Sequence, residues 1–166
     1  MKAVYPGSFD PVTSGHMDII ERGAEVFGEL VVAVAANMEK APLFSVSERV
    51  EMLREACKHL SNIEVDYFEG LLVDYVKSQN ARIIIKGLRA LSDFEFEFQM
   101  ALMNKRLDEK VETLFMMTNA EHLFLSSRMV KELAELGASV NGLVPEGVEK
   151  HLLEKLQQKA QEAHSK

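Results

Sequence analysis

The segment PGSFDPVTSGH, residues 6–16, follows a short apolar stretch and contains glycines, hydroxyl side chains and one imidazole. Gly7 permits a tight turn and a close approach of a ligand to the backbone, and Thr13 or Ser14 can cap a following helix. His16 then falls in the first helical turn, where free N–H groups and the helix dipole attract anions. Its imidazole could donate a hydrogen bond to a phosphate oxygen. The alternative is a strand-to-helix turn with an incidental surface histidine.

Two further groups of candidates follow later apolar stretches. Lys86 ends the apolar run RIIIK, and Gly87 and Arg89 follow closely. Two cations near a glycine at the end of a strand favour an anion site over a merely solvated loop. Ser126 and Ser127 can cap a helix, which explains them without any ligand. Free N–H groups at that helix start would also suit the β- and γ-phosphates of a nucleotide.

The elements that must position these residues alternate along the chain. Apolar or alternating runs predict strands, and 3.6-residue periodicity and capping boxes predict helices. The predicted strands cover residues 2–6, 29–36, 63–68, 82–86 and 112–117, and the predicted helices cover residues 15–27, 45–60, 71–79, 92–107, 126–136 and about 145–163. This order predicts one α/β, Rossmann-like domain over residues 1–166, with an open five-stranded, mostly parallel sheet flanked by helices and a C-terminal helix. Ligands of such sheets bind beyond the carboxyl ends of the strands, where the candidates above lie.

Composition excludes several classes of protein. The 166 residues carry a net charge of −7, so the chain lacks the basic footprint of a general nucleic-acid binder. We expect no membrane span, because no apolar run approaches about 18 residues, and no signal peptide, because the N-terminal apolar stretch breaks at Pro6 and Gly7. The single cysteine excludes an intrachain disulfide and paired-cysteine zinc sites. These features predict a cytoplasmic protein.

Aromatic residues in the fourth helical segment point to a contact beyond the core. Ser92 and Glu95 have capping-box spacing. On a helix, Phe94 and Phe98 share one face while Phe96 points nearly opposite. We interpret this two-sided pattern as a subunit interface.

Three stretches carry a resemblance to a known family. PGSFDPVTSGH resembles the (T/H)xGH signature of the nucleotidyltransferase superfamily, and KGLRALSDFEFEFQ (residues 86–99) and LSSRMVKE (residues 125–132) resemble the phosphopantetheine adenylyltransferase family within it. The likeness runs through nearly the whole chain in order. It implies in-line transfer of AMP from ATP to 4′-phosphopantetheine without a covalent enzyme intermediate, giving dephospho-coenzyme A and pyrophosphate. It also implies Mg²⁺ with ATP, a homohexamer built as a dimer of trimers, and feedback binding of coenzyme A.

The resemblance assigns roles residue by residue. His16, Lys40 and Arg89 would stabilise the transition state. The implied ATP-binding residues are Ser8, Phe9, His16, Gly87, Leu88, Arg89, Glu97, His122, Leu123, Phe124, Leu125, Ser126, Ser127 and Arg128, and the implied 4′-phosphopantetheine contacts are Ser8, Lys40, Leu72 and Lys86. No side chain is assigned as a metal ligand. Lys86 stands where the family commonly has arginine. Arg128 replaces a usual third serine and could either contact phosphate or point to solvent.

Other functions remain alternatives at this stage. A sister nucleotidyltransferase, such as a nicotinamide mononucleotide adenylyltransferase or a cytidylyltransferase, shares the first motif, although KGLRALSDFEFE favours the phosphopantetheine family and no RTEGIST string is present. A non-catalytic adenine-nucleotide sensor would not need His16. The missing GxxxxGK[ST] and GxGxxG motifs argue against a Walker-type ATPase and a dinucleotide-dependent oxidoreductase.

Overall fold

A computed structural model describes residues 1–36, 41–89 and 91–164. Within these residues five parallel strands form one sheet in the order β3-β2-β1-β4-β5. The strands are β1 (Lys2–Gly7), β2 (Glu29–Ala35), β3 (Ile63–Phe68), β4 (Ile83–Leu88) and β5 (Glu112–Met117). The predicted α/β class and parallel sheet are confirmed. The chain leaves β1 toward β2 and later returns to its other side as β4, so a topological switch point lies between β1 and β4.

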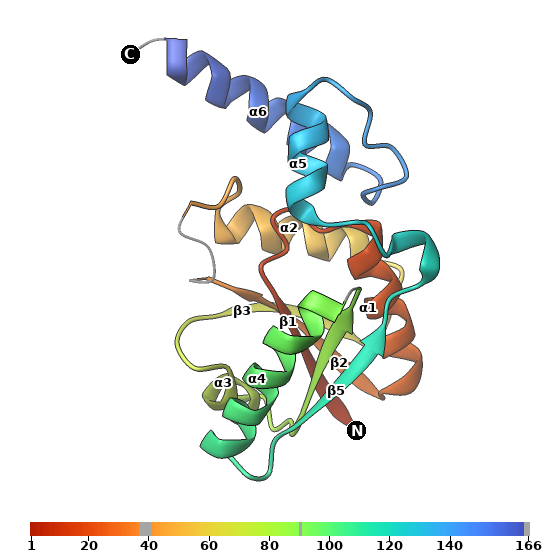
Figure 1. Cartoon of the computed structure of the whole chain (residues 1–166), viewed down its shortest axis with the longest axis vertical. Coiled ribbons are helices and arrows are strands. Elements are labelled where there is room, and N and C mark those ends of the chain that lie inside the picture. Colours follow the sequence, from red (N-terminus) through yellow and green to blue (C-terminus); the bar gives the residue numbers. More distant parts are fainter. Residues whose placement is uncertain (37–40, 90, 165–166) are drawn as a thin grey trace.

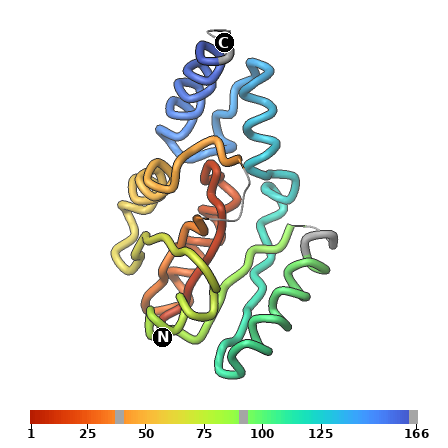
Figure 2. Tube along the Cα trace, turned by 90° about the vertical axis from the view of Figure 1, so that its left-hand side faces the viewer, coloured from red at the N-terminus to blue at the C-terminus, as the bar shows by residue number. Residues whose placement is uncertain are grey.

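Helices cover both faces of the sheet (Figures 1 and 2). They are α1 (Ser14–Val26), α2 (Val46–Cys57), α3 (Leu72–Ser78), α4 (Leu91–Leu107), α5 (Ser127–Glu135) and α6 (Val148–His164), with a short 3₁₀ turn, η1 (Ala120–His122), after β5. Tyr5 and Val32 pack in the core that includes α1 and α2, whereas Val4 and Val31 pack in the core that includes α3. Because both faces are buried, the central strands need continuous apolar runs.

Capping residues fix where the helices begin. Thr13 caps α1, and the capping box of Ser45 and Glu48 opens α2 as predicted. The predicted start of α4 is wrong, because the helix already begins at Leu91 and Ser92 lies inside it. The predicted start of the last helix near residue 145 is also wrong. Gly147 has a φ of +87°, which breaks the helical path before Val148.

The last two helices lie at the end of the molecule opposite the N-terminus (Figure 1). Val130 and Ala134 of α5 and Leu152 of α6 belong to the same apolar core as α1 and α2. Lys155 Nζ donates to Glu48 Oε1 at 2.7 Å and ties α6 to α2. The carboxyl ends of β1 and β4 point toward α5 (Figure 1).

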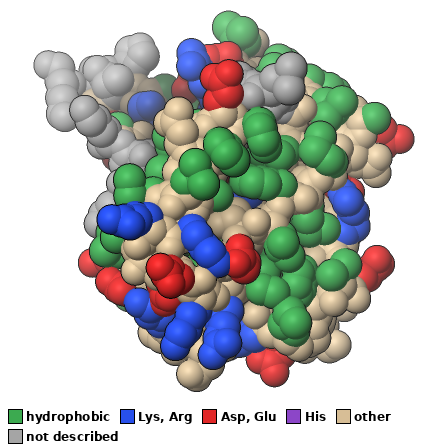
Figure 3. Space-filling view, turned by 60° about the horizontal axis from the view of Figure 1, so that its bottom comes forward, with side chains coloured by type: hydrophobic (Ala, Val, Ile, Leu, Met, Phe, Trp, Pro, Cys, Tyr) green, Lys and Arg blue, Asp and Glu red, His purple; other side chains and the backbone are tan. Residues whose placement is uncertain are grey.

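Large apolar side chains are exposed on the surface, and Figure 3 shows them gathered across one face of the molecule. On α4 and β5 they include Phe94, Phe98, Leu102, Leu107, Leu114 and Met117. The rings of Phe94 and Phe98 stack with centroids 5.7 Å apart, as expected for residues on one helical face. No helix within residues 1–36, 41–89 and 91–164 is both long and apolar enough to span a membrane.

Candidate active site

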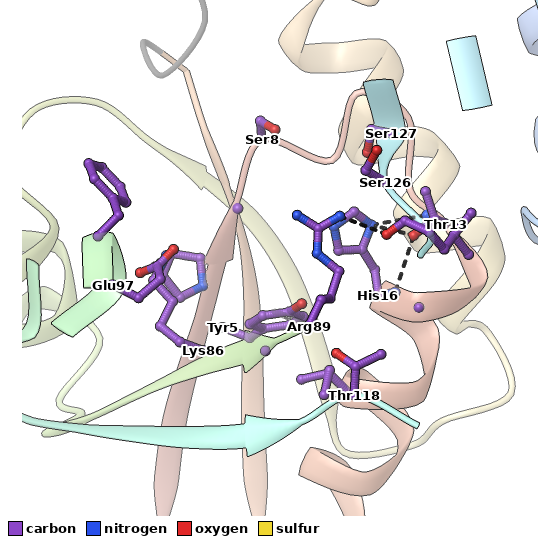
Figure 4. Close-up of a pocket in the computed structure, with 17 residues that line it drawn as sticks. Tyr5, Ser8, Thr13, His16, Lys86, Arg89, Glu97, Thr118, Ser126 and Ser127 are labelled. Atoms are coloured by element: carbon purple, nitrogen blue, oxygen red, sulfur yellow. Dashed lines mark hydrogen bonds and ion pairs between the residues drawn. The ribbon is translucent and has the colours of Figure 1, made fainter. Parts of the chain in front are cut away.

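A cavity of about 460 Å³ opens at the switch point between β1 and β4 (Figure 4). Its walls come from the ends of β1, β4 and β5 and from the starts of α1 and α5. The lining residues are Tyr5, Pro6, Gly7, Ser8, Thr13, Gly15, His16, Ile19, Lys86, Gly87, Arg89, Phe96, Glu97, Thr118, Leu125, Ser126 and Ser127. The three regions singled out in the sequence, near residues 6–16, 86–97 and 125–127, therefore meet at one place.

The turn after β1 is built around the buried ring of Phe9. This residue has a φ of +49°, and its side chain is completely buried. A Cβ on Gly7 would lie 2.9 Å from Phe9 Cζ, so glycine is required for the ring to fold under the turn. The same ring meets His16 edge-on, with centroids 5.0 Å apart. Phe9 thus supports the imidazole from below.

The cap of α1 fixes the tautomer of His16. The backbone N–H of Thr13 donates to His16 Nδ1 at 3.0 Å, and the Thr13 hydroxyl lies 3.1 Å from the same nitrogen. A backbone amide can only donate, so Nδ1 is an acceptor and carries no proton. The ring hydrogen of the neutral imidazole is therefore on Nε2. The His16 amide in turn donates to Thr13 Oγ1, which completes a reciprocal capping box.

The surroundings keep this imidazole uncharged. Burial and the nearby Arg89 guanidinium lower the pKa of His16 to about 4. The free protein therefore holds a neutral imidazole at neutral pH, with Nε2–H as its available donor. Such a group can bind an anionic oxygen without the cost of burying another cation.

The start of α5 forms a second wall of the cavity. The Ser126 hydroxyl accepts from the Met129 amide, which makes it the N-cap, and the Ser127 hydroxyl donates to the Pro11 carbonyl at 2.8 Å. Arg89 Nη1 donates to the Leu125 carbonyl at 2.7 Å. These bonds place the N–H end of a nine-residue helix, which attracts anions, beside an arginine.

An ion pair occupies the other side of the cavity. Lys86 Nζ donates to Glu97 Oε1 at 3.2 Å, and both side chains are largely buried. Glu97 Oε2 is buried and accepts no hydrogen bond from any described residue. Figure 4 shows this pair on the side of the cavity away from His16 and Arg89. Glu97 Oε2 also lies 3.2 Å from Lys86 Nζ, so a bound ligand would find a cation paired with both carboxylate oxygens there.

Two buried charged groups hold the turn in place from behind. The fully buried Asp10 carboxylate accepts from the amides of Leu43 and Phe44 at 2.9 and 2.8 Å and from Lys131 Nζ at 2.7 Å. Burial alone would raise the pKa of Asp10, but these hydrogen bonds bring it below its usual value. The buried Arg49 guanidinium donates to the Ser8 carbonyl at 2.8 Å. Both groups make the turn rigid.

Metal ligands of the usual kind do not cluster in the described part of the chain. No group of three histidine, cysteine, aspartate or glutamate side chains in residues 1–36, 41–89 and 91–164 could hold a metal ion. Glu97 is the carboxylate that lines the cavity, and it forms an ion pair with Lys86.

Comparison with known proteins decides the family. A family model described as cytidylyltransferase-like matches residues 4–133. A phosphopantetheine adenylyltransferase of Carboxydothermus hydrogenoformans is 61% identical over 93% of this chain and 96% of its own length. Another, from Dictyoglomus turgidum, is 55% identical over 96% of this chain and 99% of its own. The chain belongs to the phosphopantetheine adenylyltransferase family. This confirms the resemblance found in the sequence.

The fold alone is shared more widely than this family. A crystal structure from Vibrio parahaemolyticus, described as a nicotinate-nucleotide adenylyltransferase, matches with a TM-score of 0.68 over 93% of each chain at 17% identity. Identity this low supports a common Rossmann-like architecture and nothing finer. The distinction between phosphopantetheine adenylyltransferases and their sister enzymes therefore depends on the high-identity relatives.

The cavity collects many of the residues that the family resemblance implies. Those that line it are Ser8, His16, Lys86, Gly87, Arg89, Glu97, Leu125, Ser126 and Ser127. Others lie outside its lining: Phe9 and Leu88 are buried, Leu72 packs against the α3 core, and His122, Leu123 and Phe124 lie on η1 and the loop after it. Lys40 lies outside the described residues.

Arg128 takes one of the two orientations that the sequence left open. Its side chain is 88% exposed and donates to Glu132 at 3.1 Å, so it points to solvent. Arg128, which replaces the usual third serine, therefore does not line the cavity.

Several lining residues were not singled out from the sequence. Tyr5, Ile19 and Thr118 are the clearest examples, whereas Phe96 was singled out for a subunit interface and lines the cavity instead. Tyr5 lies within a strand and Thr118 directly follows one, so each looks like part of the core in the sequence. The strand order places the ends of β1, β4 and β5 side by side, and local patterns do not reveal that order.

Proposed function

We propose that this chain transfers AMP from ATP to 4′-phosphopantetheine, which yields dephospho-coenzyme A and pyrophosphate. The family is shown by relatives 55–61% identical over most of the chain, and those relatives are phosphopantetheine adenylyltransferases. The observation that carries the proposal in the structure is the fixed tautomer of His16. Its Nδ1 is held by the helix cap, so a neutral Nε2–H donor is available in a cavity that also contains Lys86 and Arg89.

The proposed reaction needs positioning and charge stabilisation more than acid–base chemistry. The attacking phosphate oxygen of 4′-phosphopantetheine is ionised at neutral pH, so no general base is needed. It attacks the α-phosphorus of ATP in line, a P–O bond forms, and pyrophosphate leaves with the electron pair of the broken bond. Negative charge spreads over the α-phosphate oxygens in the transition state. His16 Nε2–H and the Arg89 guanidinium are proposed to stabilise that charge.

The remaining assignments place the two substrates. We propose that the N–H groups at the start of α5, with Ser126 and Ser127, bind the β- and γ-phosphates, since a helix start is suited to anions. Lys86 and Ser8 would bind the phosphate of 4′-phosphopantetheine. Lys40, Leu72, Phe9, Leu88, Glu97 and the residues 122–125 keep the roles that the family resemblance implies. ATP is proposed to enter as its Mg²⁺ complex, with the metal carried by the phosphates.

Assembly, regulation and location extend the proposal. We propose that residues 1–166 act as one nucleotidyltransferase domain and that six chains assemble as a dimer of trimers through the apolar surface of α4 and β5. Coenzyme A is proposed to bind as a feedback inhibitor, because it contains the pantetheine and adenine-nucleotide parts of the product. The enzyme is proposed to work in the cytoplasm, where ATP is abundant.

Pyrophosphate release measured with a panel of acceptors tests the activity. With ATP and Mg²⁺, 4′-phosphopantetheine should support pyrophosphate release. Two control pairs should not: ATP with nicotinamide mononucleotide, and CTP with glycerol 3-phosphate. Release with either control pair in place of 4′-phosphopantetheine would assign the chain to a sister activity. ATP binding without release for any acceptor would instead support a nucleotide sensor.

A further inference from the structure

The hydroxyl of Tyr5 lies at the cavity wall and has no hydrogen-bond partner among the described residues. Tyr5 is only 6% exposed, and its side chain lines the cavity. No described residue donates to or accepts from its hydroxyl, although the phenols of most buried tyrosines have a partner. By contrast, the hydroxyl of Tyr75 donates to Asp66 at 2.8 Å. A hydroxyl that lines the cavity and makes no hydrogen bond to a described residue is available to an atom of a bound ligand.

The location of this hydroxyl is central to the cavity. A Cβ on Gly87 would lie 3.5 Å from Tyr5 Oη, so the oxygen lies next to the glycine that directly follows Lys86. Figure 4 shows Tyr5 between the Lys86–Glu97 pair on one side and Arg89 with His16 on the other. The Tyr5 ring is held there by an edge-on contact with Phe9, with centroids 5.5 Å apart.

The charge around Tyr5 determines what its hydroxyl can do. Burial raises the pKa of Tyr5 well above its usual value, and Arg89 opposes this only in part. The phenol is therefore protonated at neutral pH, and it can donate a hydrogen bond. The cations near it, Lys86 and Arg89, attract anions, so the acceptor that reaches the Tyr5 hydroxyl is an anionic oxygen.

We propose that the Tyr5 hydroxyl is a further binding group of this site, which donates a hydrogen bond to a phosphate oxygen of the bound substrates. The inference rests on the proposed function for the identity of those substrates. It adds a neutral donor from β1 to the donors that come from α1, β4 and α5. All four would converge on the phosphates from different elements.

The substitution Tyr5→Phe separates the hydroxyl from the ring. It removes one oxygen that has no partner among the described residues and keeps the contact with Phe9, so the melting temperature should stay within a few degrees of the parent. Loss of a hydrogen bond to a charged group should lower kcat/KM for ATP by about 10- to 100-fold. Tyr75→Phe is the matched control, because it removes a partnered phenol outside the cavity lining and should leave kcat/KM unchanged.

A binding measurement on the unaltered sequence complements the kinetics. The chain has three tyrosines, so labelling with 3-fluorotyrosine gives three ¹⁹F resonances, which Tyr67→Phe and Tyr75→Phe assign by elimination. Saturation with ATP alone, or with pyrophosphate, should shift the Tyr5 resonance and leave that of Tyr75 in place. This readout does not require Tyr5→Phe to fold.

The outcomes separate this inference from the proposed function. A folded Tyr5→Phe variant with kcat/KM within twofold of the parent overturns the role of the hydroxyl and leaves the proposed function intact. A Tyr5 resonance that does not move at saturating ATP overturns it as well. A parent protein that binds ATP with a shifted Tyr5 resonance but releases no pyrophosphate overturns the proposed function and supports the binding role.

Discussion

The capping box of α1 couples the helix start to the chemistry of His16. Thr13 occupies Nδ1, so the imidazole presents its other nitrogen as a donor. Burial and Arg89 keep the pKa of His16 at about 4, so the donor is neutral in the free protein. A neutral donor avoids repulsion with Arg89 before the substrates bind. The role of His16 can therefore be tested both in turnover and in stability.

Removal of the imidazole should abolish most turnover. His16→Ala deletes one donor to the developing charge on the α-phosphate, and loss of such a donor commonly costs about 10²–10³ in kcat. The substitution should leave the circular dichroism spectrum unchanged, because α1 keeps Thr13 as its cap. His151→Ala, at an exposed histidine on α6, is the control and should retain full kcat. A His16→Ala variant with near-parental kcat would remove His16 from the mechanism.

His16 should also make the protein less stable in mild acid. The unfolded chain binds a proton at the ordinary pKa of 6.5, whereas the folded chain resists protonation down to a pKa of about 4. Between these values the unfolded state binds more protons, so the free energy of unfolding falls as the pH is lowered. From pH 7 to pH 5 the loss should be roughly 1–2 kcal/mol, allowing for water in the cavity.

Urea denaturation at pH 7 and pH 5 measures this effect. His16→Gln should lose less stability than the parent over this interval, because it has no imidazole to protonate. Asp10 does not confound the comparison, since its lowered pKa affects stability only below the ordinary carboxyl range. Equal losses in parent and variant would show that the imidazole titrates normally in the folded state.

At the scale of elements, long-range polar contacts dock α5 onto the turn after β1. Lys131 reaches Asp10 across 121 positions of sequence, and Ser127 reaches the Pro11 carbonyl across 116. The same Asp10 carboxylate binds the amides of Leu43 and Phe44, which precede α2. One buried carboxylate thus joins the turn after β1, the segment before α2, and α5.

Asp10→Asn should destabilise the protein measurably. It removes the charge opposite Lys131 and leaves a buried amide among donors, which should cost about 2–3 kcal/mol in the free energy of unfolding. Urea denaturation at pH 7 measures the change, with Asp74→Asn at an exposed position of α3 as the control. A change as small as that of the control would show that the carboxylate is not needed to join these segments.

The sequence reveals the elements better than their arrangement. Continuous apolar runs identify β2 and β4 because both faces of the sheet are covered. The T-x-x-H spacing of α1 points to His16 as a candidate, because one turn of helix carries both the Thr13 cap and the imidazole. Contacts between distant segments, such as Tyr5 beside Gly87, depend on which strands become neighbours. Local spacing does not encode that choice.

For the whole molecule, the net charge of −7 and the phosphate-binding proposal are compatible. The cations of the cavity, Lys86 and Arg89, stand at the carboxyl end of β4, beside the start of α5. Their effect is local, because water and salt screen charges farther away than about 10 Å. Outside the cavity, the exposed apolar side chains of α4 and β5 are the feature that a single chain leaves unexplained.

Assembly into a hexamer should cover these side chains. Light scattering coupled to size-exclusion chromatography should give six chains of 18.7 kDa, about 112 kDa. Leu102→Glu places a charge at a 56% exposed position of α4 and should shift the mass toward smaller species. Leu136→Glu, at an 85% exposed position after α5, should leave the hexamer intact. A monomeric parent protein would contradict the assembly.

Mass spectrometry of the reaction products tests the central claim most directly. The parent protein, incubated with ATP, Mg²⁺ and 4′-phosphopantetheine, should form dephospho-coenzyme A in a one-to-one ratio with pyrophosphate, and His16→Ala should form neither at a comparable rate. A parent protein that leaves 4′-phosphopantetheine unchanged while it consumes ATP with another acceptor, or does not consume ATP at all, would contradict the account.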